Sequence, residues 1–238
     1  MNDPDLAGLE SDEGWLYSSS RSVGLGDPGR FHALFGRDSL ISSLQLLPVR
    51  PDIARATLRA LARRQGHGVN PVTLEEPGKI GHEFRPQTPP TMIDAGWPGR
   101  GEFNYYATAD ATAWFLVVLA SLDDRALRDE LEDAWRGAGG WLAGALDRGG
   151  GLVRHAPTAV PGGLVQQGWR DSHDPADGTG GGILHADGRV PGPRLADADT
   201  QAVTYAGCGR SPGSIPMVGG TSGPRRCRRT SRPRSDPR

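Results

Sequence analysis

The spacing of hydrophobic residues predicts two helices near the start of the chain. The first ends before Pro48, with Asp38 or Ser39 as its expected N-cap. Its apolar stripe consists of Leu40, Ile41, Leu44 and Leu47. The second begins at Pro51, a residue suited to the first helical position, and ends at Gly66. Its inward positions are Ala54, Leu58, Leu61 and Ala62. We expect the two helices to pack as an antiparallel pair.

A second helical pair is predicted in the middle of the chain. Residues 108–122 are apolar on every side from Ala113 to Ala120, which fits a helix buried all round or a buried strand, and the length favours the helix. Residues 125–146 repeat at helical spacing, although three glycines are expected to bend or split that helix: Gly137, Gly139 and Gly140. Residues 196–206 are weakly helical.

Long polar segments separate the predicted helices. Residues 67–104 are rich in proline and glycine and lack periodicity, which is typical of a site-forming loop rather than of a simple connection. Within them, residues 75–85 combine three acids, two bases and a histidine, and proline and glycine prevent a helix there. Residues 147–195 are a second irregular region. The pattern therefore predicts an all-α protein whose chemistry lies in its loops.

Charge is distributed unevenly along the 238 residues. The net charge is −1, but residues 207–238 carry eight arginines and a single acid, Asp236, so the rest of the chain is acidic. Both cysteines also fall in this last segment, which leaves the body without a disulfide or a thiolate. We expect the segment to be a disordered basic tail, and the out-of-frame translation of a GC-rich gene gives the same composition. Its arginines could contact nucleic acid, but we expect no nucleic-acid partner.

Other classes of protein are disfavoured by what the motifs lack. No apolar run approaches the roughly 18 residues of a membrane span, and the N-terminus lacks the apolar core of a signal peptide, so we expect a cytoplasmic protein without a membrane partner. His82 and Glu83 lack the second histidine of a zinc helix, and Asp174 and Asp177 have the wrong spacing for a calcium loop. No Gly-x-Ser-x-Gly turn is present. We expect neither a metal nor a cofactor.

Six short motifs occur in an order that resembles a known family. They are Leu34–Leu40, Arg50–Gly66, Glu75–Arg85, Tyr105–Tyr106 with Asp110–Thr112, Gln167–Ser172 and Asp199–Gln201. Read together, they resemble the catalytic domain of the glycogen debranching (amylo-α-1,6-glucosidase) group and the related six-hairpin toroid glycosidases, including mannosylglycerate hydrolases. The resemblance implies an (α/α)6 toroid whose loops form a sugar pocket. It divides the chain into a lead-in (1–30), a partial toroid (31–206) and the tail (207–238).

The resemblance also implies roles for individual residues. It makes Asp171 the catalytic acid, beside Trp169, whose indole can desolvate the carboxyl group and stack on a sugar ring. The implied substrate-binding residues are Arg37, Asp38, Lys79, His82, Glu83, Arg85, Asp110, Trp169 and Gln201. Structural roles stay open for several of them. Asp171 could form a turn, and Asp38 and Asp110 could cap helices. His82, Glu83 and Arg85 could instead form an ion-paired brace within their loop.

The expected function is therefore that of an inverting hydrolase of α-glucosidic bonds, acting on an oligosaccharide or a small α-glycoside. Inversion requires a second carboxylate about 6.5–9.5 Å from the acid. Because the resemblance ends near Ala206, we expect the chain to be a fragment that lacks this base and is inactive alone. The alternative is a non-catalytic, truncated sugar-binding helical domain. The sequence does not define the oligomeric state.

Overall fold

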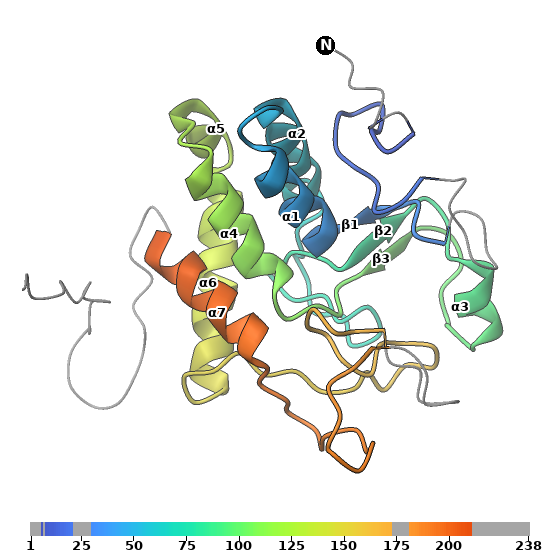
Figure 1. Ribbon diagram of the computed structural model, residues 1–238. Helices are drawn as coiled ribbons and strands as arrows, with labels where there is room; N and C mark the ends of the chain where they lie inside the picture. Colours follow the sequence, from blue (N-terminus) through green and yellow to red (C-terminus); the bar gives the residue numbers. More distant parts are fainter. Residues whose placement is uncertain (1–5, 7, 21–29, 173–180, 211–238) are drawn as a thin grey trace, which may run out of the picture.

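The computed structural model describes residues 6, 8–20, 30–172 and 181–210. These residues form seven helices and a three-stranded antiparallel sheet (Figure 1). The helices are α1 (Gly36–Leu46), α2 (Pro51–Ala62), α3 (Pro90–Asp94), α4 (Ala111–Ser121), α5 (Arg125–Glu130), α6 (Glu132–Arg148) and α7 (Ala198–Arg210). The strands are β1 (Leu34–Phe35), β2 (Glu83–Arg85) and β3 (Phe103–Tyr105), in the order β1-β2-β3.

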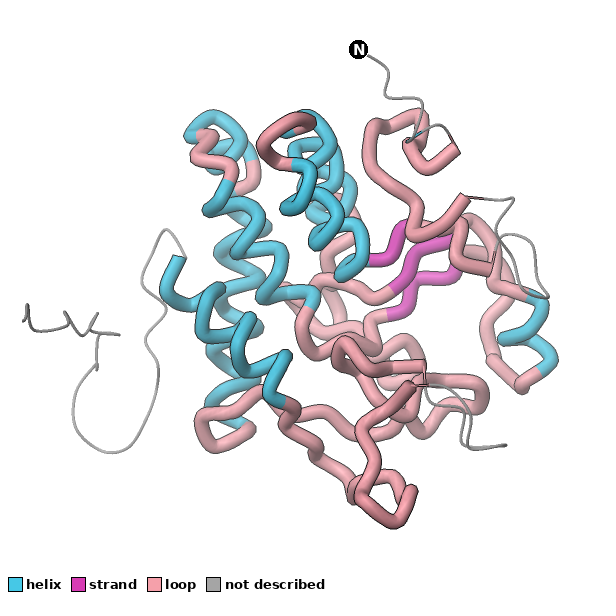
Figure 2. The backbone as a smooth tube through the Cα atoms, in the orientation of Figure 1, coloured by secondary structure: helices cyan, strands magenta, loops and turns pink. Residues whose placement is uncertain are grey.

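The prediction of an all-α fold, an incomplete (α/α)6 toroid, is wrong. The described residues form a mixed structure, in which β2 pairs with β1 on one side and with β3 on the other. Two of these strands come from the segment that the sequence presented as an irregular loop. Because the strands are only two or three residues long, they contain no run of alternating residues from which a strand could be recognised. Figure 2 shows this small sheet among long loops, beside the helices.

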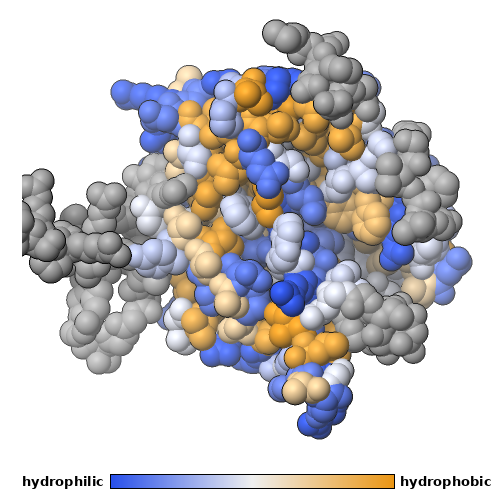
Figure 3. Space-filling model, in the orientation of Figure 1, coloured by the Kyte–Doolittle hydropathy of each residue, from blue (hydrophilic) through white to orange (hydrophobic). Residues whose placement is uncertain are grey.

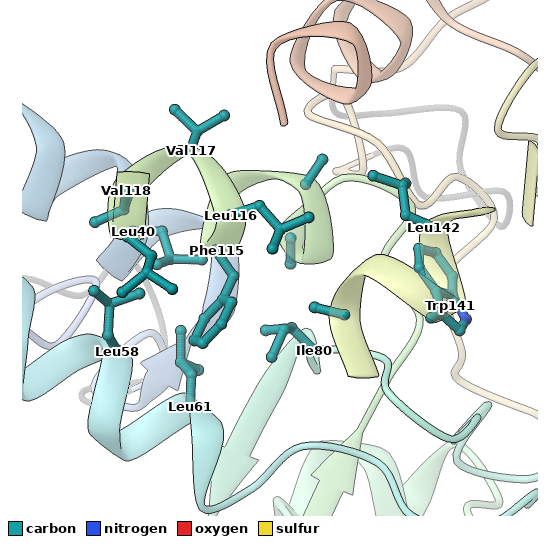
Figure 4. Close-up of a cluster of buried hydrophobic side chains, with 14 of the residues drawn as sticks. Leu40, Leu58, Leu61, Ile80, Phe115, Leu116, Val117, Val118, Trp141 and Leu142 are labelled. Atoms are coloured by element: carbon teal, nitrogen blue, oxygen red, sulfur yellow. The ribbon is translucent and has the colours of Figure 1, made fainter. Parts of the chain in front are cut away.

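Helix α4 is the centre of the hydrophobic core. It packs against α1, α2, α6 and α7, and its residues from Phe115 to Leu119 are all buried. Figure 4 shows Phe115 beside Leu61 of α2, with Leu40 of α1 close by. A helix with partners on several sides must be apolar all round. The prediction of a buried helix at this place is therefore confirmed.

The first helical pair is confirmed, with different ends. Helix α1 begins at Gly36 with Phe35 in the N-cap position, so Asp38 lies in the first turn and is not the cap. Helix α2 begins at Pro51 as expected but ends at Ala62, before Gly66. Helices α1 and α2 pack against each other.

The second predicted pair, residues 108–122 and 125–146, forms helices, but the second of them is interrupted at a different residue than expected. The chain breaks at Leu131, between α5 and α6, and all three glycines lie within the continuous helix α6. One of them, Gly137, contacts the loop residue Gly78. A Cβ atom added to Gly78 would lie 2.2 Å from the carbonyl oxygen of Gly137. Gly137 therefore allows a loop to pack closely on the helix.

We predict that Gly78→Ala destabilises the protein by at least about 2 kcal/mol, because its φ of +84° is unfavourable for alanine and the new methyl group would overlap with Gly137. The matched control is Gly140→Ala, at an exposed position of α6 where a Cβ would meet nothing within 4 Å. This control should stabilise the protein by about 0.5–1 kcal/mol. Urea unfolding measures both changes. Equal stability of the two variants would contradict the packing described here.

The predicted lead-in (1–30) and tail (207–238) are only partly described by the structure. Trp15, from the predicted lead-in, joins the main hydrophobic core, and Ser39 donates a hydrogen bond to the carbonyl of Leu16 at 2.8 Å. Helix α7 continues past residue 206 to Arg210, with Cys208 buried. The predicted basic tail from residue 211 onward, including Cys227, lies outside the described residues.

The described helices were compared with the length and hydropathy that a membrane span requires. Among them, none is both long and apolar enough to cross a bilayer. On the face in Figure 3, hydrophilic residues are interspersed with hydrophobic ones.

Candidate functional site

The junction of β1 and α1 places Arg37 in the interior. The amide of Gly36 donates to the carbonyl of His82 at 2.9 Å, which joins the start of α1 to the loop before β2. A Cβ atom at Gly36 would lie 2.1 Å from the carbonyl oxygen of Gly81, so this position requires glycine. The side chain that follows, Arg37, is only 4% exposed.

Arg37 contacts residues that lie more than 70 positions away from it in the chain. Its Nη2 donates to Oδ2 of Asp171 at 2.5 Å, and its Nη1 lies 3.5 Å from Oδ1 of Asp110. Nη1 also donates to the carbonyl of Gly168 at 2.8 Å. The guanidinium carbon lies 5.5 Å from the centre of the Trp169 ring, in a cation–π contact. The structure thus brings together four of the residues predicted from three separate motifs.

Burial and the neighbouring charges together shift the pKa values of Asp110 and Arg37. Burial raises the pKa of Asp110, while Arg37 and a 2.8 Å hydrogen bond from the Thr108 hydroxyl oppose that rise. For Arg37, burial works toward a lower pKa, but the charges of Asp110, Asp171 and Asp38 together hold it above its usual value. Arg37 is therefore a permanent cation. Asp110 occupies the N-cap position of α4, yet its carboxylate makes no capping bond and instead faces Arg37.

A cavity of about 2210 Å³ opens beside this cluster. Six of the predicted site residues line it: Arg37, Asp38, His82, Glu83, Arg85 and Asp171. Aromatic residues share the wall, among them Phe35 and Tyr105. Charged groups that alternate with aromatic faces suit a ligand with many hydroxyl groups and apolar ring faces.

His82 and Glu83 reach the cavity from β2 and the residue before it. The His82 ring lies edge-on to Phe35 at 5.4 Å and to Tyr105 at 5.9 Å. Burial, with a further contribution from Arg37, lowers the pKa of His82 to about 3, so the ring is neutral at physiological pH. Burial raises the pKa of Glu83, and its ion pair with Arg85 opposes that rise.

Four predicted residues do not line this cavity. Asp110 lies behind Arg37, and Trp169 contacts Arg37 while 52% of its surface is exposed. Gln201 forms two hydrogen bonds with the backbone of Val153, at 3.0 and 2.8 Å, and so holds α7 to the loop after α6. Lys79 lines a second cavity and lies 5.4 Å from the centre of the Trp141 ring.

A buried pair that was not predicted from the sequence, His155 and Asp197, lies behind the site. Nε2 of His155 lies 3.2 Å from Oδ2 of Asp197, and Nδ1 of His155 accepts a hydrogen bond from the amide of Gln167 at 3.3 Å. Burial would raise the pKa of Asp197, but hydrogen bonds from His155 and Thr200 lower it to about 2. The pair therefore supports Gln167, the residue before Gly168, whose carbonyl accepts a hydrogen bond from Arg37. The spacing of Asp197 and Thr200 is a helix-start signal in the sequence, whereas nothing local marks His155.

No family model matches the chain, and no curated protein matches it.

Proposed function

We propose that the larger cavity binds an oligosaccharide or a small α-glycoside and that the protein hydrolyses its α-glucosidic bond. The convergence of Arg37, Asp110 and Asp171 beside this cavity carries the proposal. Arginine forks and carboxylates are the groups that hold sugar hydroxyls in bidentate hydrogen bonds. The order of the six sequence motifs gives further support through the resemblance to debranching-type glycosidases.

In this proposal Asp171 is the acid that protonates the departing oxygen. Its side chain is 18% exposed and lines the cavity, so a substrate can reach it. The other described carboxylates that line the cavity are those of Asp38, Glu75, Glu83 and Glu102. The sequence predicts that the general base is absent from this chain, so hydrolysis by the chain alone requires one of these carboxylates to act as the base. Arg85 holds Glu83 in place through their ion pair.

The ion pair between Arg37 and Asp171 favours a second candidate function. A carboxylate held by arginine is an acceptor for sugar hydroxyls, and the same arrangement serves a sugar-binding site without catalysis. This alternative uses the same cavity and differs only in the fate of the bound sugar.

Proton NMR during incubation of the purified protein with isomaltose, panose and trehalose distinguishes the two functions. Release of glucose that appears first as the β-anomer would support inverting hydrolysis. Saturable binding without any release would support the sugar-binding alternative. The absence of both binding and release would overturn the proposal.

A further inference from the structure

A second cavity, of about 560 Å³, also borders the loop that precedes β2 and shares Asn70 and Glu75 with the larger cavity. Most of its wall comes from residues 69–79, the C-terminal end of α6 and residues 153–159, and the rest comes from Thr108, Ala109, Gln167 and Arg194. The apolar part of the lining includes Leu74, Trp141, Ala145 and Val153. Its volume is typical of a site for a small molecule.

The charged lining of this cavity is predominantly positive. Four cationic residues contribute to it, namely Lys79, Arg148, Arg154 and Arg194, against two acids, Glu75 and Glu76. Glu76 pairs with Arg148 at 2.9 Å and lies 3.6 Å from Nζ of Lys79. Glu75 accepts hydrogen bonds from the backbone amides of His67 and Gly68. The acids are therefore already engaged.

Two arginines at the cavity are not neutralised. Arg154 donates to the carbonyl groups of Gly149 and Arg194, at 2.9 and 3.3 Å. Within the described part of the chain, neither Arg154 nor Arg194 forms an ion pair with a carboxylate. Both side chains belong to exposed residues and can turn toward an incoming anion. They provide up to two guanidinium forks at one cavity.

Lys79 places a buried charge in the same cavity. It is 4% exposed, and burial lowers its pKa to about 8, with Arg148 acting in the same direction and Glu76 against it. An anion beside its ammonium group would therefore stabilise the charged form. A buried lysine that is only partly compensated is costly for the empty protein, and a bound anion would relieve that cost.

We propose that this second cavity binds a phosphate group, either as free phosphate or as part of a small phosphorylated molecule. Arg154 and Arg194 supply planar donors that match phosphate oxygens, and Lys79 supplies the buried positive charge. The apolar wall around Trp141 and Val153 accommodates the organic part of a phosphorylated molecule. This site is independent of the proposed hydrolase activity, since its charged donors are not those of the larger cavity.

Calorimetric titration with inorganic phosphate and with glucose 6-phosphate tests the proposal, and glucose is the neutral control. Arg154→Gln and Arg194→Asn should each weaken binding about tenfold, the effect of one charge-assisted hydrogen bond. Asparagine suits position 194 because the φ there is +73°. Arg136→Gln removes the same charge from α6 at its Glu132 pair, outside the cavity, and should leave binding unchanged.

The uniqueness of Lys79 in the sequence provides a second readout. Reductive methylation with ¹³C-formaldehyde gives one lysine signal, and phosphate should raise the pKa that this signal reports. Tighter binding of glucose 6-phosphate than of phosphate would show that the ligand has an organic part, and equal binding would show that phosphate is the whole ligand. Absence of heat and of any change in the Lys79 signal, or binding that all three arginine variants retain, would overturn the proposal.

Discussion

Replacing Arg37 with methionine should lower the free energy of unfolding by about 3–5 kcal/mol, the usual cost of removing one partner from a buried ion pair. Methionine is of similar length, so packing changes little, but Asp110 and Asp171 lose their shared cation. Gly168 also loses its hydrogen bond from Nη1. Chemical unfolding at pH 7 measures the loss.

The control for this prediction is Arg59→Met. Arg59 pairs with Glu130 on the surface, where both side chains are more than 40% exposed, and such a pair contributes less than about 1 kcal/mol. If Arg37→Met destabilised the protein no more than Arg59→Met, the buried cluster would not have the energetic role described here.

The loss of unfolding free energy caused by Arg37→Met should decrease as the pH falls. A carboxyl group whose pKa is raised by folding stabilises the folded protein at low pH, and that contribution is lost as the pH rises through the folded pKa. Without Arg37 the pKa of Asp110 should rise further, because one of the influences that lowers it is removed. The destabilisation by Arg37→Met should therefore shrink as the pH falls from 7 toward about 4, the pKa of an unfolded aspartate. A loss that is independent of pH would indicate a packing defect instead.

Asp171→Asn should reduce the hydrolysis of ordinary α-glucosides by about 10²–10⁴-fold, because an amide cannot protonate the departing oxygen. Hydrolysis of α-glucosyl fluoride should be reduced much less, since fluoride departs with little protonation. The ratio of kcat/KM for the two substrates measures the effect. Asparagine keeps the shape of the side chain and still accepts a hydrogen bond from Arg37, so the fold should be preserved.

Glu83→Gln is the comparison that separates a proton donor from a sugar-holding residue. It should weaken the reaction of both substrates alike if Glu83 only binds hydroxyl groups in the transition state. An equal loss on both substrates for Asp171→Asn would remove Asp171 from the role of acid. A selective loss for Glu83→Gln would assign the acid to Glu83, whose pKa burial already raises.

The helices of this protein could be predicted because their signals are local. The stripe of α2 and the fully apolar run of α4 follow directly from residue spacing, and both were found where expected. The sheet could not be predicted, because β1 and β2 are separated by almost 50 residues and each pairs over only two or three positions. For the glycines of α6, the local signal was present but misleading. Gly137 was expected to interrupt a helix, whereas its actual role, contact with Gly78, depends on a distant loop.

The motifs that carry the candidate site residues could be read from the sequence, but the arrangement of their side chains could not. The Arg37 and Asp171 motifs were identified separately, and only the structure shows their side chains in contact. Lys79 was grouped with His82 because they are neighbours in sequence, yet they line different cavities. No local sequence pattern marked His155, because its partner, Asp197, lies 42 positions further along the chain.

The central claim is that the larger cavity binds a sugar, and calorimetric titration of the wild-type protein with panose tests it most directly. We predict saturable binding that Asp38→Asn weakens about tenfold, because Asp38 lines the cavity, as expected for one lost charged hydrogen bond. Asp129→Asn changes the same charge in an exposed pair with Arg125 and should have no effect. No heat of binding from panose, isomaltose or trehalose, or binding that Asp38→Asn and Asp129→Asn leave equally unchanged, would contradict the account.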